Sequence, residues 1–401
     1  MSDLPRFIEV SRTFTSLRRK LIQWVKKTTN FPMKVAWIPA MNDQYFLAQA
    51  FTLARRGIYT TDPNPRVGCV IVRDGQIIGE GFHQSAGKDH AEVVAIDKAD
   101  GDVKGATVYV TLEPCSYIGR TPACAKMLVE KGIKRVVSAD YDPHPLNAGQ
   151  GYAILEAAGV EVVRQANPES ALQLNPGHYK SHQQGLPFVR LKMACTLDGH
   201  TALADGSSKW ITSASARLDV QRLRARSSCI VTGIETILQD DPALTVREPN
   251  IDPHAGDLAI NRKRPVYILD SHLRTPMSAR VLAHPDARIV CGHKLDQDQA
   301  RVIGASLNED GRICLKRFLQ ELSEQGALEV LFECGPTLGG ALIDSGLCDE
   351  LIIYMAPKLM GSGRPLLQLP EIANMSALRT FSFDDVRSIG ADLRLILKPG
   401  S

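Results

Sequence analysis

Four residues in the first half of the chain have types and spacing suited to zinc chemistry. His90 and Glu92 stand two residues apart in the stretch HAEVVAIDKA, and Cys115 and Cys124 flank the stretch SYIGRTPA. One imidazole and two thiolates make a three-ligand zinc site whose fourth position is left to water, as in catalytic zinc sites. Zinc lowers the pKa of bound water to about 7. The sequence therefore predicts a hydrolytic centre with His90, Cys115 and Cys124 as metal ligands.

Glu92 is predicted to be the catalytic proton carrier of this centre. It lies on the same helical turn as His90 and is not needed as a ligand, so it is suited to take a proton from the water and deliver it to a leaving amine. This chemistry is hydrolytic deamination of a heterocycle. A purely structural zinc would recruit a fourth protein ligand and would have no use for Glu92, which disfavours a non-catalytic zinc protein.

The elements that must position these residues alternate between helix and strand, which favours a sheet covered by helices. A helix beginning at Met41 is expected, with Asp43 as its N-cap and Gly57 as its stop. The pair Asp74-Gly75 predicts a two-residue hairpin turn between β-branched runs. The remaining predicted elements are a helix over 90–99, a strand over 106–114, a helix over 123–130 and a strand over 135–140.

A second domain is expected after the stretch NPGHYKSHQQGLP, where Pro, Gly and polar residues break the pattern. In that half LFECGPTLGGALI reads as an apolar strand, a glycine-rich turn and a helix, an arrangement that binds phosphate or pyrophosphate. It is not G-x-G-x-x-G, and a loop without function is the alternative. A helix with Ser213 as N-cap carries four arginines, which suit either an anionic ligand or a solvated basic face.

Composition excludes several classes of function. At 401 residues and 44% hydrophobic content the chain suffices for two domains. No apolar run approaches the ~18 residues that span a bilayer, and no signal-peptide pattern opens the chain. The nine cysteines are an odd number in scattered apolar contexts, which favours reduced thiols over disulfides. These features predict a cytoplasmic protein without a membrane span.

The positive charge is concentrated at the start of the chain. Residues 1–40 hold eight of the 47 basic and two of the 44 acidic residues, so the rest carries 39 basic against 42 acidic residues. Nucleic-acid binders usually show a clustered basic excess, and the body of this chain does not. The leader could be a targeting segment, an appendage or the product of a start codon assigned too early.

The motifs of the first half are similar to those of a known family. HAE with TLEPC resembles the cytidine-deaminase-like superfamily, and DPNPRVGCVIV with EPCSYIGRTPAC resembles the deaminase half of bifunctional riboflavin-biosynthesis deaminase/reductases. Eight residues separate Cys115 from Cys124, whereas nucleic-acid deaminases commonly have two between their cysteines. By this resemblance Asn64 would hydrogen-bond the pyrimidine. The sequence departs from the family at Tyr117, usually histidine, and at Ala123, usually proline.

The second half resembles the reductase half of the same family, whose fold is like that of dihydrofolate reductase and whose cofactor is NADPH. The motifs that carry the resemblance are LKMACTLDGHTALADGSSKWITS, DVQRLRA, DDPALTVR and FECGPTLGGALI. The resemblance implies NADPH contacts at Ala194, Trp210, Thr236, Asp240, Ser271, Gly335, Pro336, Thr337, Leu338, Gly339, Gly340 and Ala341. It implies substrate contacts at Lys192, Ser208, Arg224, Leu244, Arg247 and Glu333.

Together these observations predict a two-step α/β enzyme. A cytidine-deaminase-like α/β/α domain over 41–185 would follow an extension over 1–40 and precede a dihydrofolate-reductase-like α/β domain over 186–401. The first would deaminate a phosphoribosylaminopyrimidine with zinc, and the second would reduce its ribose to ribitol with NADPH. The small-molecule substrate leaves no role for nucleic acid or membrane, and the family implies a homo-oligomer. The rival interpretation is a nucleoside or RNA deaminase whose second half is a binding module.

Overall fold

The computed structural model describes residues 38–117, 123–248, 251–292 and 301–400. Residues Phe46–Ser401 form one compact unit, and of the separate unit Met1–Tyr45 only the residues from Ile38 onward are described. Residues 1–37 of the leader therefore lie outside the described residues, whereas residues 38–40 are described as the start of a helix. No helix in the described ranges is long and apolar enough to cross a membrane.

The first half of the chain builds a five-stranded sheet in the order β2-β1-β3-β4-β5. Only the contacts of β1 with β2 and β3 are antiparallel. The strands are β1 (Gly68–Arg73), β2 (Gln76–Phe82), β3 (Thr107–Val110), β4 (Arg135–Ser138) and β5 (Glu161–Val163). The helices are α2 (Ile38–Ala54), α3 (Ala91–Lys98), α4 (Cys124–Glu130), α5 (Gln150–Ala157), α6 (Pro168–Leu174) and α7 (Pro176–Gln184), with a 3-10 turn η1 (Arg55–Gly57) after α2.

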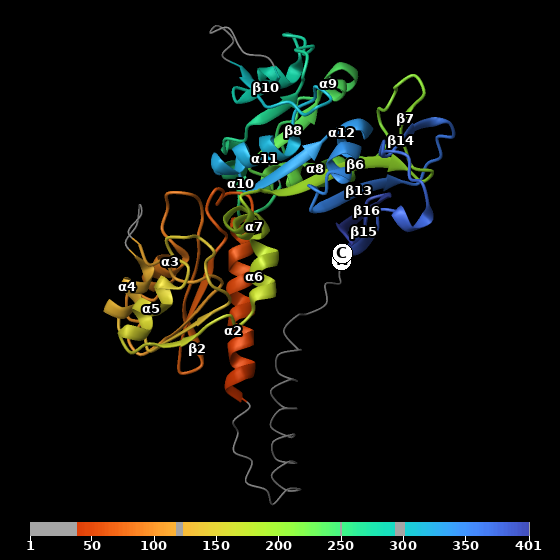
Figure 1. Cartoon of the computed structure of the whole chain (residues 1–401). Coiled ribbons are helices and arrows are strands. Elements are labelled where there is room, and N and C mark those ends of the chain that lie inside the picture. The colour runs from red at the N-terminus through yellow and green to blue at the C-terminus, as the bar shows by residue number, and fades with distance from the viewer. Residues whose placement is uncertain (1–37, 118–122, 249–250, 293–300, 401) are drawn as a thin grey trace, which may run out of the picture. The chain divides into compact units, whose positions relative to one another are not determined.

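Alternating side chains of this sheet fill two separate cores. On β1, Val70 and Val72 pack with α2, α6 and Tyr179 of α7, whereas Cys69 and Ile71 pack with α3, α4 and α5. This is the period of two expected for a strand that is buried on both faces. The result is a three-layer α/β/α arrangement, in which Figure 1 shows α2 and α6 on one side of the sheet and α3, α4 and α5 on the other.

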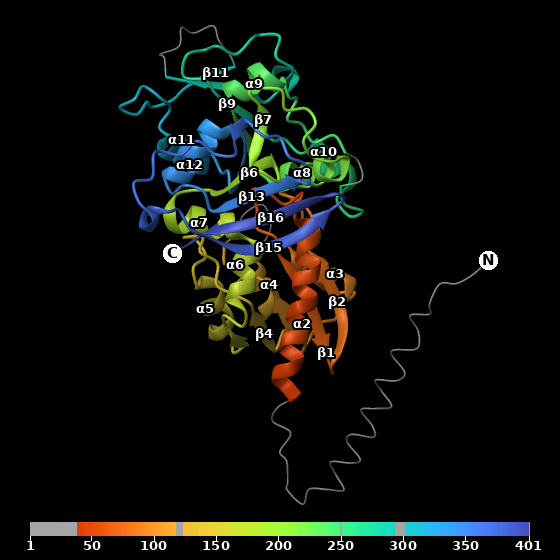
Figure 2. The same cartoon turned by 90° about the vertical axis from the view of Figure 1, so that its right-hand side faces the viewer.

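The second half builds a nine-stranded sheet in the order β11-β10-β9-β8-β12-β6-β13-β16-β15, parallel except at the last two strand pairs. Figure 2 shows β13, β16 and β15 side by side. The strands are β6 (Phe188–Thr196), β8 (Cys229–Gly233), β9 (Val266–Leu269), β10 (Ala287–Cys291), β11 (Val302–Gly304), β12 (Glu329–Glu333), β13 (Glu350–Ala356), β15 (Phe381–Ile389) and β16 (Asp392–Pro399). A separate two-stranded sheet pairs β7 (His200–Leu203) with β14 (Gly363–Pro365).

Helices cover both faces of the larger sheet. The helices are α8 (Ala214–Arg226), α9 (Ile234–Asp240), α10 (Gly256–Asn261), α11 (Leu315–Glu324) and α12 (Pro336–Asp344), with the 3-10 turns η2 (Arg280–Ala283) and η3 (Met375–Ala377). Leu331 of β12 packs with α8, whereas its neighbours Val330 and Phe332 pack with α11 and α12. The predicted cap is confirmed, because the Ser213 side chain accepts a hydrogen bond from the N–H of Ala216 at the start of α8.

Two predictions about helices in the first half are wrong. Helix α2 begins at Ile38, so Asp43 lies inside it and is not its N-cap. Pro39 falls in the first turn, where a missing N–H costs nothing. The stretch 176–184, taken as a break, forms helix α7. Pro176 stands at its first position and Gly185 ends it with a φ of 67°, so these residues punctuate the helix rather than interrupt it.

Candidate functional site: a metal centre and a ligand cleft

The three predicted zinc ligands converge at one point. The His90 Nδ1 atom lies 3.5 Å from the Cys115 Sγ atom and 3.3 Å from the Cys124 Sγ atom. Tetrahedral zinc with ordinary Zn–N and Zn–S bonds places such atoms roughly 3.5 to 3.8 Å apart. The donor types and spacing therefore fit a zinc ion. Within the described ranges this is the one group of three or more His, Cys, Asp or Glu side chains arranged to hold a metal.

Helix starts supply two of the ligands. His90 is the N-cap of α3, and Cys124 is the first residue of α4. The Cys124 N–H donates a hydrogen bond to the Cys115 Sγ atom at 3.2 Å. A hydrogen bond with Cys124 lowers the pKa of the Cys115 thiol below its usual value. Both effects favour the thiolate form of Cys115, which is the form that binds metal.

Glu92 lies in the first turn of α3, and its residue is only 3% exposed. Burial raises the pKa of the Glu92 carboxyl above its usual value, although neighbouring His90 opposes the shift. A carboxyl in this environment holds a proton more readily than one in water. Glu92, the predicted proton carrier, therefore lies beside the predicted metal ligands, and its raised pKa favours the protonated form.

Close packing between α3 and β2 fixes where this helix begins. A Cβ atom on Gly81 would lie 2.3 Å from the Ala91 carbonyl oxygen, and one on Gly79 would lie 2.1 Å from the Ala95 carbonyl oxygen. Only glycine permits such an approach of strand to helix. These two glycines therefore allow His90 and Glu92 to reach the metal centre.

The structure adds His83 to the site, a residue that sequence reasoning missed. The Asn64 Nδ2 atom lies 3.0 Å from the His83 Nε2 atom, and the His83 Nδ1 atom lies 3.0 Å from the Asp89 carbonyl oxygen. The Nδ1–H tautomer satisfies both contacts, because it donates to Asp89 and accepts from Asn64. The rings of His83 and His90 meet edge to face with centroids 5.6 Å apart. His83 thus connects the predicted substrate residue Asn64 to the metal centre.

The two departures from the family pattern flank the part of the cysteine loop that falls outside the described residues, 118–122. Tyr117 is partly exposed and stacks on His144 with ring centroids 5.7 Å apart. Ala123 takes the N-cap position of α4 without a side-chain hydrogen bond. With both departures present, the two cysteine Sγ atoms lie within 3.5 Å of His90 Nδ1.

The predicted reductase residues gather around one cleft of about 1750 Å³ in the second half. A pocket for one small ligand measures about 300–1,000 Å³, so this cleft has room for a cofactor and a substrate together. Predicted NADPH residues that line it are Ala194, Trp210, Thr236, Asp240, Ser271, Gly335, Pro336, Thr337, Leu338 and Ala341. Predicted substrate residues that line it are Lys192, Ser208, Arg224, Leu244, Arg247 and Glu333.

Gly339 and Gly340 are the two predicted NADPH residues that do not line the cleft. Both are buried in α12, where a Cβ atom on Gly340 would lie 1.9 Å from the Gln368 carbonyl oxygen. The structure therefore places them where α12 packs against the 366–368 segment. In this glycine-rich stretch Gly340 therefore allows close packing, whereas Gly335 lines the cleft.

A charged group lies on the floor of the cleft at the end of β12. Glu333 accepts hydrogen bonds from Arg224 Nε at 2.5 Å and Arg224 Nη2 at 3.0 Å, and its Oε2 atom lies 3.9 Å from Lys192 Nζ. Burial alone would raise the pKa of Glu333, but Arg224 and Lys192 lower it below its usual value. Burial lowers the pKa of Lys192. Arg224 is thus hydrogen-bonded to Glu333 at two points, whereas Arg247 is an exposed residue that lines the cleft.

The rim of the cleft carries Trp210, which is 66% exposed. The Arg217 guanidinium lies over its ring, 4.5 Å from the centroid, a contact that the sequence did not reveal. Ser208 Oγ donates to Asp240 Oδ1 at 2.7 Å and Lys209 Nζ donates to the Asp240 carbonyl at 2.8 Å. These two contacts hold the loop that carries Trp210 against Asp240, the last residue of α9.

Comparisons with known proteins agree with both halves. A family model for the cytidine and deoxycytidylate deaminase zinc-binding region matches residues 40–140, and one for the RibD C-terminal domain matches residues 187–395. The chain is 44% identical to riboflavin biosynthesis protein RibD of Escherichia coli K12 over 89% of this chain and 99% of that protein. It is 42% identical to the RibD protein of Haemophilus influenzae over 89% of this chain and 97% of that one.

Solved structures give the same result. RibD of Acinetobacter baumannii has 43% sequence identity and a TM-score of 0.82, covering 90% of this chain and all of that one. A deaminase/reductase from Thermotoga maritima has 31% identity and a TM-score of 0.78, covering 90% of this chain and 99% of that one. Because the reductase domain itself is matched, the rival interpretation of the second half as a binding module is wrong. The chain belongs to the RibD family of bifunctional deaminase and reductase enzymes of riboflavin biosynthesis, which use zinc and NADPH.

Proposed function

We propose that the chain deaminates 2,5-diamino-6-(5-phosphoribosylamino)pyrimidin-4(3H)-one and then reduces the ribosyl chain of the resulting 5-amino-6-(5-phosphoribosylamino)uracil to ribityl. The observation that carries this proposal is the joint presence of the His90, Cys115 and Cys124 cluster and the reductase cleft in one chain. The Thermotoga maritima relative is described as a deaminase and reductase acting on these compounds, and it matches 90% of this chain.

In the first step His90, Cys115 and Cys124 hold the zinc ion, and Glu92 moves protons. A zinc ion held there would supply an activated water for attack on the ring carbon that carries the amino group. Glu92 takes the water's proton and passes it to the departing ammonia. Its burial supports this role, because a carboxyl with a raised pKa holds the proton between the two transfers.

Asn64 and His83 orient the pyrimidine in this step. Asn64 lies on the loop before β1, and its amide contacts His83 beside the metal ligand His90. An amide offers a donor and an acceptor side by side, which suits the edge of a pyrimidine. Asn64 therefore binds the ring while His83 fixes the direction of its amide.

In the second step the cleft holds NADPH and the ribosyl chain together. The cofactor carries the hydride, and the protein supplies position and electrostatics. Glu333 and Lys192 face the substrate, and Arg224 keeps Glu333 ionised and in place. Arg247 binds the substrate phosphate, since a guanidinium forms forked, charge-assisted hydrogen bonds with phosphate.

The domain limits and the setting of the enzyme are part of the same proposal. The deaminase domain spans 41–185 and the reductase domain 186–401, which contain nearly all of the matched ranges 40–140 and 187–395. A cytoplasmic location is supported by the nine cysteines, none of which forms a disulfide, as expected in a reducing compartment. The enzyme acts as a homo-oligomer on its small-molecule substrate without nucleic acid.

The test is to supply the purified protein with the diaminopyrimidine substrate and to follow ammonia and NADPH separately. We expect ammonia release without NADPH, and NADPH oxidation once the cofactor is added. Mass spectrometry should then show the deaminated and the reduced products in that order. Ammonia release with no NADPH oxidation at any cofactor concentration would contradict the second step.

A further inference from the structure

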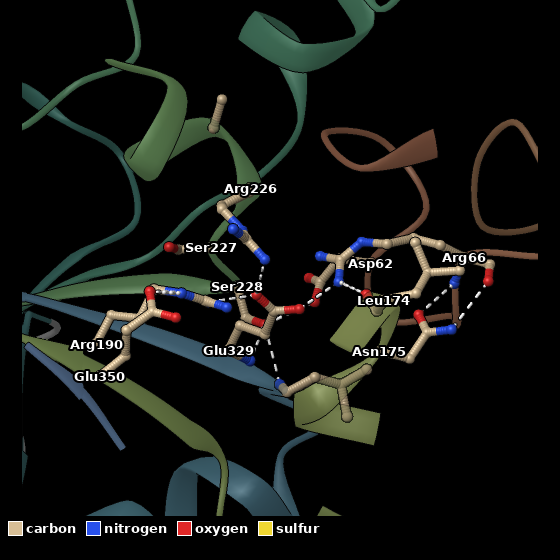
Figure 3. A network of polar contacts seen from close by, with 12 residues as sticks. Asp62, Arg66, Leu174, Asn175, Arg190, Arg226, Ser227, Ser228, Glu329 and Glu350 are labelled. Carbon is tan, nitrogen blue, oxygen red and sulfur yellow. Dashed lines mark hydrogen bonds and ion pairs between the residues drawn. The ribbon is translucent and has the colours of Figure 1, made fainter. Parts of the chain in front are cut away.

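A buried network of charged side chains joins the loop that carries Asn64 to the reductase half of the same compact unit (Figure 3). We refer to it as the junction network. Its members come from the loop before β1, from β6, from the end of α8, from the segment before β9 and from β12. They are Asp62, Arg66, Arg190, Arg226, Arg262 and Glu329.

Glu329, the first residue of β12, is the centre of one part of this network. It is 2% exposed, and its two carboxylate oxygens contact Arg66 and Arg190 directly. Arg226 Nη2 lies 3.4 Å from its Oε2 atom. Burial would raise the pKa of Glu329, but the three guanidinium groups hold it well below its usual range. A buried carboxylate with three such partners has little freedom to move.

Asp62 anchors the loop at a second point. Its Oδ2 atom accepts a hydrogen bond from Arg262 Nη1 at 2.5 Å, and its Oδ1 atom accepts one from Ser228 Oγ at 2.6 Å. The same Ser228 oxygen accepts the backbone N–H groups of Leu328 and Glu329 at 2.9 Å and 3.0 Å. Ser228 therefore ties Asp62 to the start of β12.

The two anchors stand on either side of Asn64, at two residues before it and two residues after it. The backbone of Arg66 is also fixed, because Asn175 accepts its N–H at 2.8 Å and donates to its carbonyl at 2.9 Å. Between these anchors Asn64 meets His83 beside the metal ligands. The loop that carries Asn64 is thus held from both halves, by Asn175 of the first half and by the contacts of Asp62 and Arg66 with Arg262 and Glu329 of the second.

We propose that Arg262 and Glu329, which belong to the reductase half, are positioning residues of the deaminase site. Through Asp62 and Arg66 they hold the Asn64 loop in the conformation that binds the pyrimidine. The loop contains a turn, in which the Asn64 N–H donates to the Thr61 carbonyl at 2.9 Å, but no helix or strand, so the anchors at Asp62 and Arg66 add constraints on its position. This inference rests on the proposed contact of Asn64 with the substrate.

A misplacement of about 1 Å in a binding group can cost a reaction about 100-fold. Loss of one anchor should therefore change deamination without changing the chemistry in the reductase cleft. Neither Asp62 nor Arg262 lines that cleft. Reductase turnover in the same protein then serves as an internal measure of the folded fraction.

The experiment compares Asp62→Asn with a matched control in the full-length, zinc-loaded protein. Asp349→Asn is the control, because Asp349 also joins the two halves, accepting from Lys180 Nζ at 2.6 Å and 2.8 Å, but away from the Asn64 loop. Deaminase kcat and KM are measured with the diaminopyrimidine, and reductase kinetics with the aminouracil and NADPH. Asn64→Ala is measured in parallel.

We expect Asp62→Asn to raise the deaminase KM at least about tenfold, as Asn64→Ala does, with reductase kinetics within about twofold of wild type. Asp349→Asn should leave both activities unchanged. If Asn64→Ala raises KM and Asp62→Asn does not, the positioning role is contradicted while the proposed substrate contact stands. If Asn64→Ala leaves KM unchanged, the substrate contact fails and the inference fails with it.

Asp62→Asn leaves the Arg262 charge buried without a carboxylate, which can prevent folding. The double variant Asp62→Asn/Arg262→Gln removes both charges and covers that case. It should show the same increase in deaminase KM with normal reductase turnover. An equal loss of both activities per folded molecule in this variant would contradict a specific positioning role.

Discussion

Zinc should be required for one activity of this protein and not for the other. Treatment with a strong chelator is expected to stop ammonia release, because His90, Cys115 and Cys124 would lose the ion that activates water. NADPH oxidation with the aminouracil should continue, since no cleft residue belongs to this cluster. Added zinc should restore ammonia release, and metal analysis should show about one zinc ion per chain. Parallel loss of both activities would contradict the separation.

Arg217 is expected to contribute to NADPH binding through the ring of Trp210. Replacing it in Arg217→Met removes a cation–π contact worth about 0.5–1 kcal/mol, so the KM for NADPH should rise about two- to fivefold. Arg222→Met is the matched control, because Arg222 lies on the same helix and does not line the cleft. Steady-state kinetics with varied NADPH measure both. An equal KM in the two variants would rule out this role.

Individual residues differed in how far the sequence revealed them. The convergence of His90, Cys115 and Cys124 could be predicted because metal coordination demands fixed residue types, whereas the catalytic role of Glu92 stays a prediction. His83 could not, since its meaning depends on the contact with Asn64, 19 residues away, and on its ring contact with His90. Arg224 was predicted to contact substrate and lines the cleft, but the sequence did not reveal that its guanidinium donates two hydrogen bonds to Glu333.

At the scale of elements, the contact between β2 and α3 controls the metal centre. Gly81→Ala is expected to push back the first turn of α3, which begins beside His90, because the new Cβ would overlap the Ala91 carbonyl. Zinc affinity and ammonia release should both fall, and reductase activity should persist. Gly79→Ala meets the helix one turn later and should reduce zinc affinity less. Zinc titration of the two variants distinguishes them, and equal affinities would contradict this account.

Local patterns predicted elements well where turn chemistry was unambiguous. The Asp74-Gly75 turn has φ values of 53° and 76° and joins β1 to β2 as expected. Helix α7 could not be predicted from Pro176 and Gly185, because the same two residue types occur in chain breaks and at the two ends of a helix. The start of α2 was predicted too late, because Asp43 is a residue type that often caps helices. The structure shows that the residues before Asp43 are helical as well.

At the scale of the whole molecule, the junction network should make stability depend on acid pH. Glu329 has a pKa lowered from its ordinary 4.5, so the native state binds its proton less readily than the unfolded chain does. Its contribution is therefore complete well above pH 4.5 and is lost as pH falls below that value towards the native pKa. Glu329→Gln should be destabilised by about 3–5 kcal/mol at pH 7, because three guanidinium groups lose their carboxylate.

Denaturant unfolding of wild type and Glu329→Gln at several pH values measures this effect. The difference in unfolding free energy should narrow as the pH falls below 4.5, because Glu329 of the unfolded wild-type chain then binds a proton that the native state does not bind. A difference that stays constant over this range would mean that the ionised carboxylate is not what stabilises the junction.

Long-range contacts of this kind could not be predicted from the sequence. Arg66 and Glu329 are 263 residues apart, and neither stands in a pattern that marks a partner. The order of the two domains could be predicted, because each has local motifs. The contacts between the reductase half and the Asn64 loop are visible only in the structure. Charged side chains from both halves are buried there, and a buried charge is stable only when it is paired.

The order of the two reactions is the central claim, and Glu92→Gln tests it most directly. The variant is given the diaminopyrimidine with NADPH, and in a second reaction the aminouracil with NADPH. We predict that ammonia release and NADPH oxidation in the first reaction both fall at least about 100-fold. NADPH oxidation in the second reaction should proceed at the wild-type rate. NADPH oxidation by this variant with the diaminopyrimidine would show that reduction does not depend on deamination and would contradict the account.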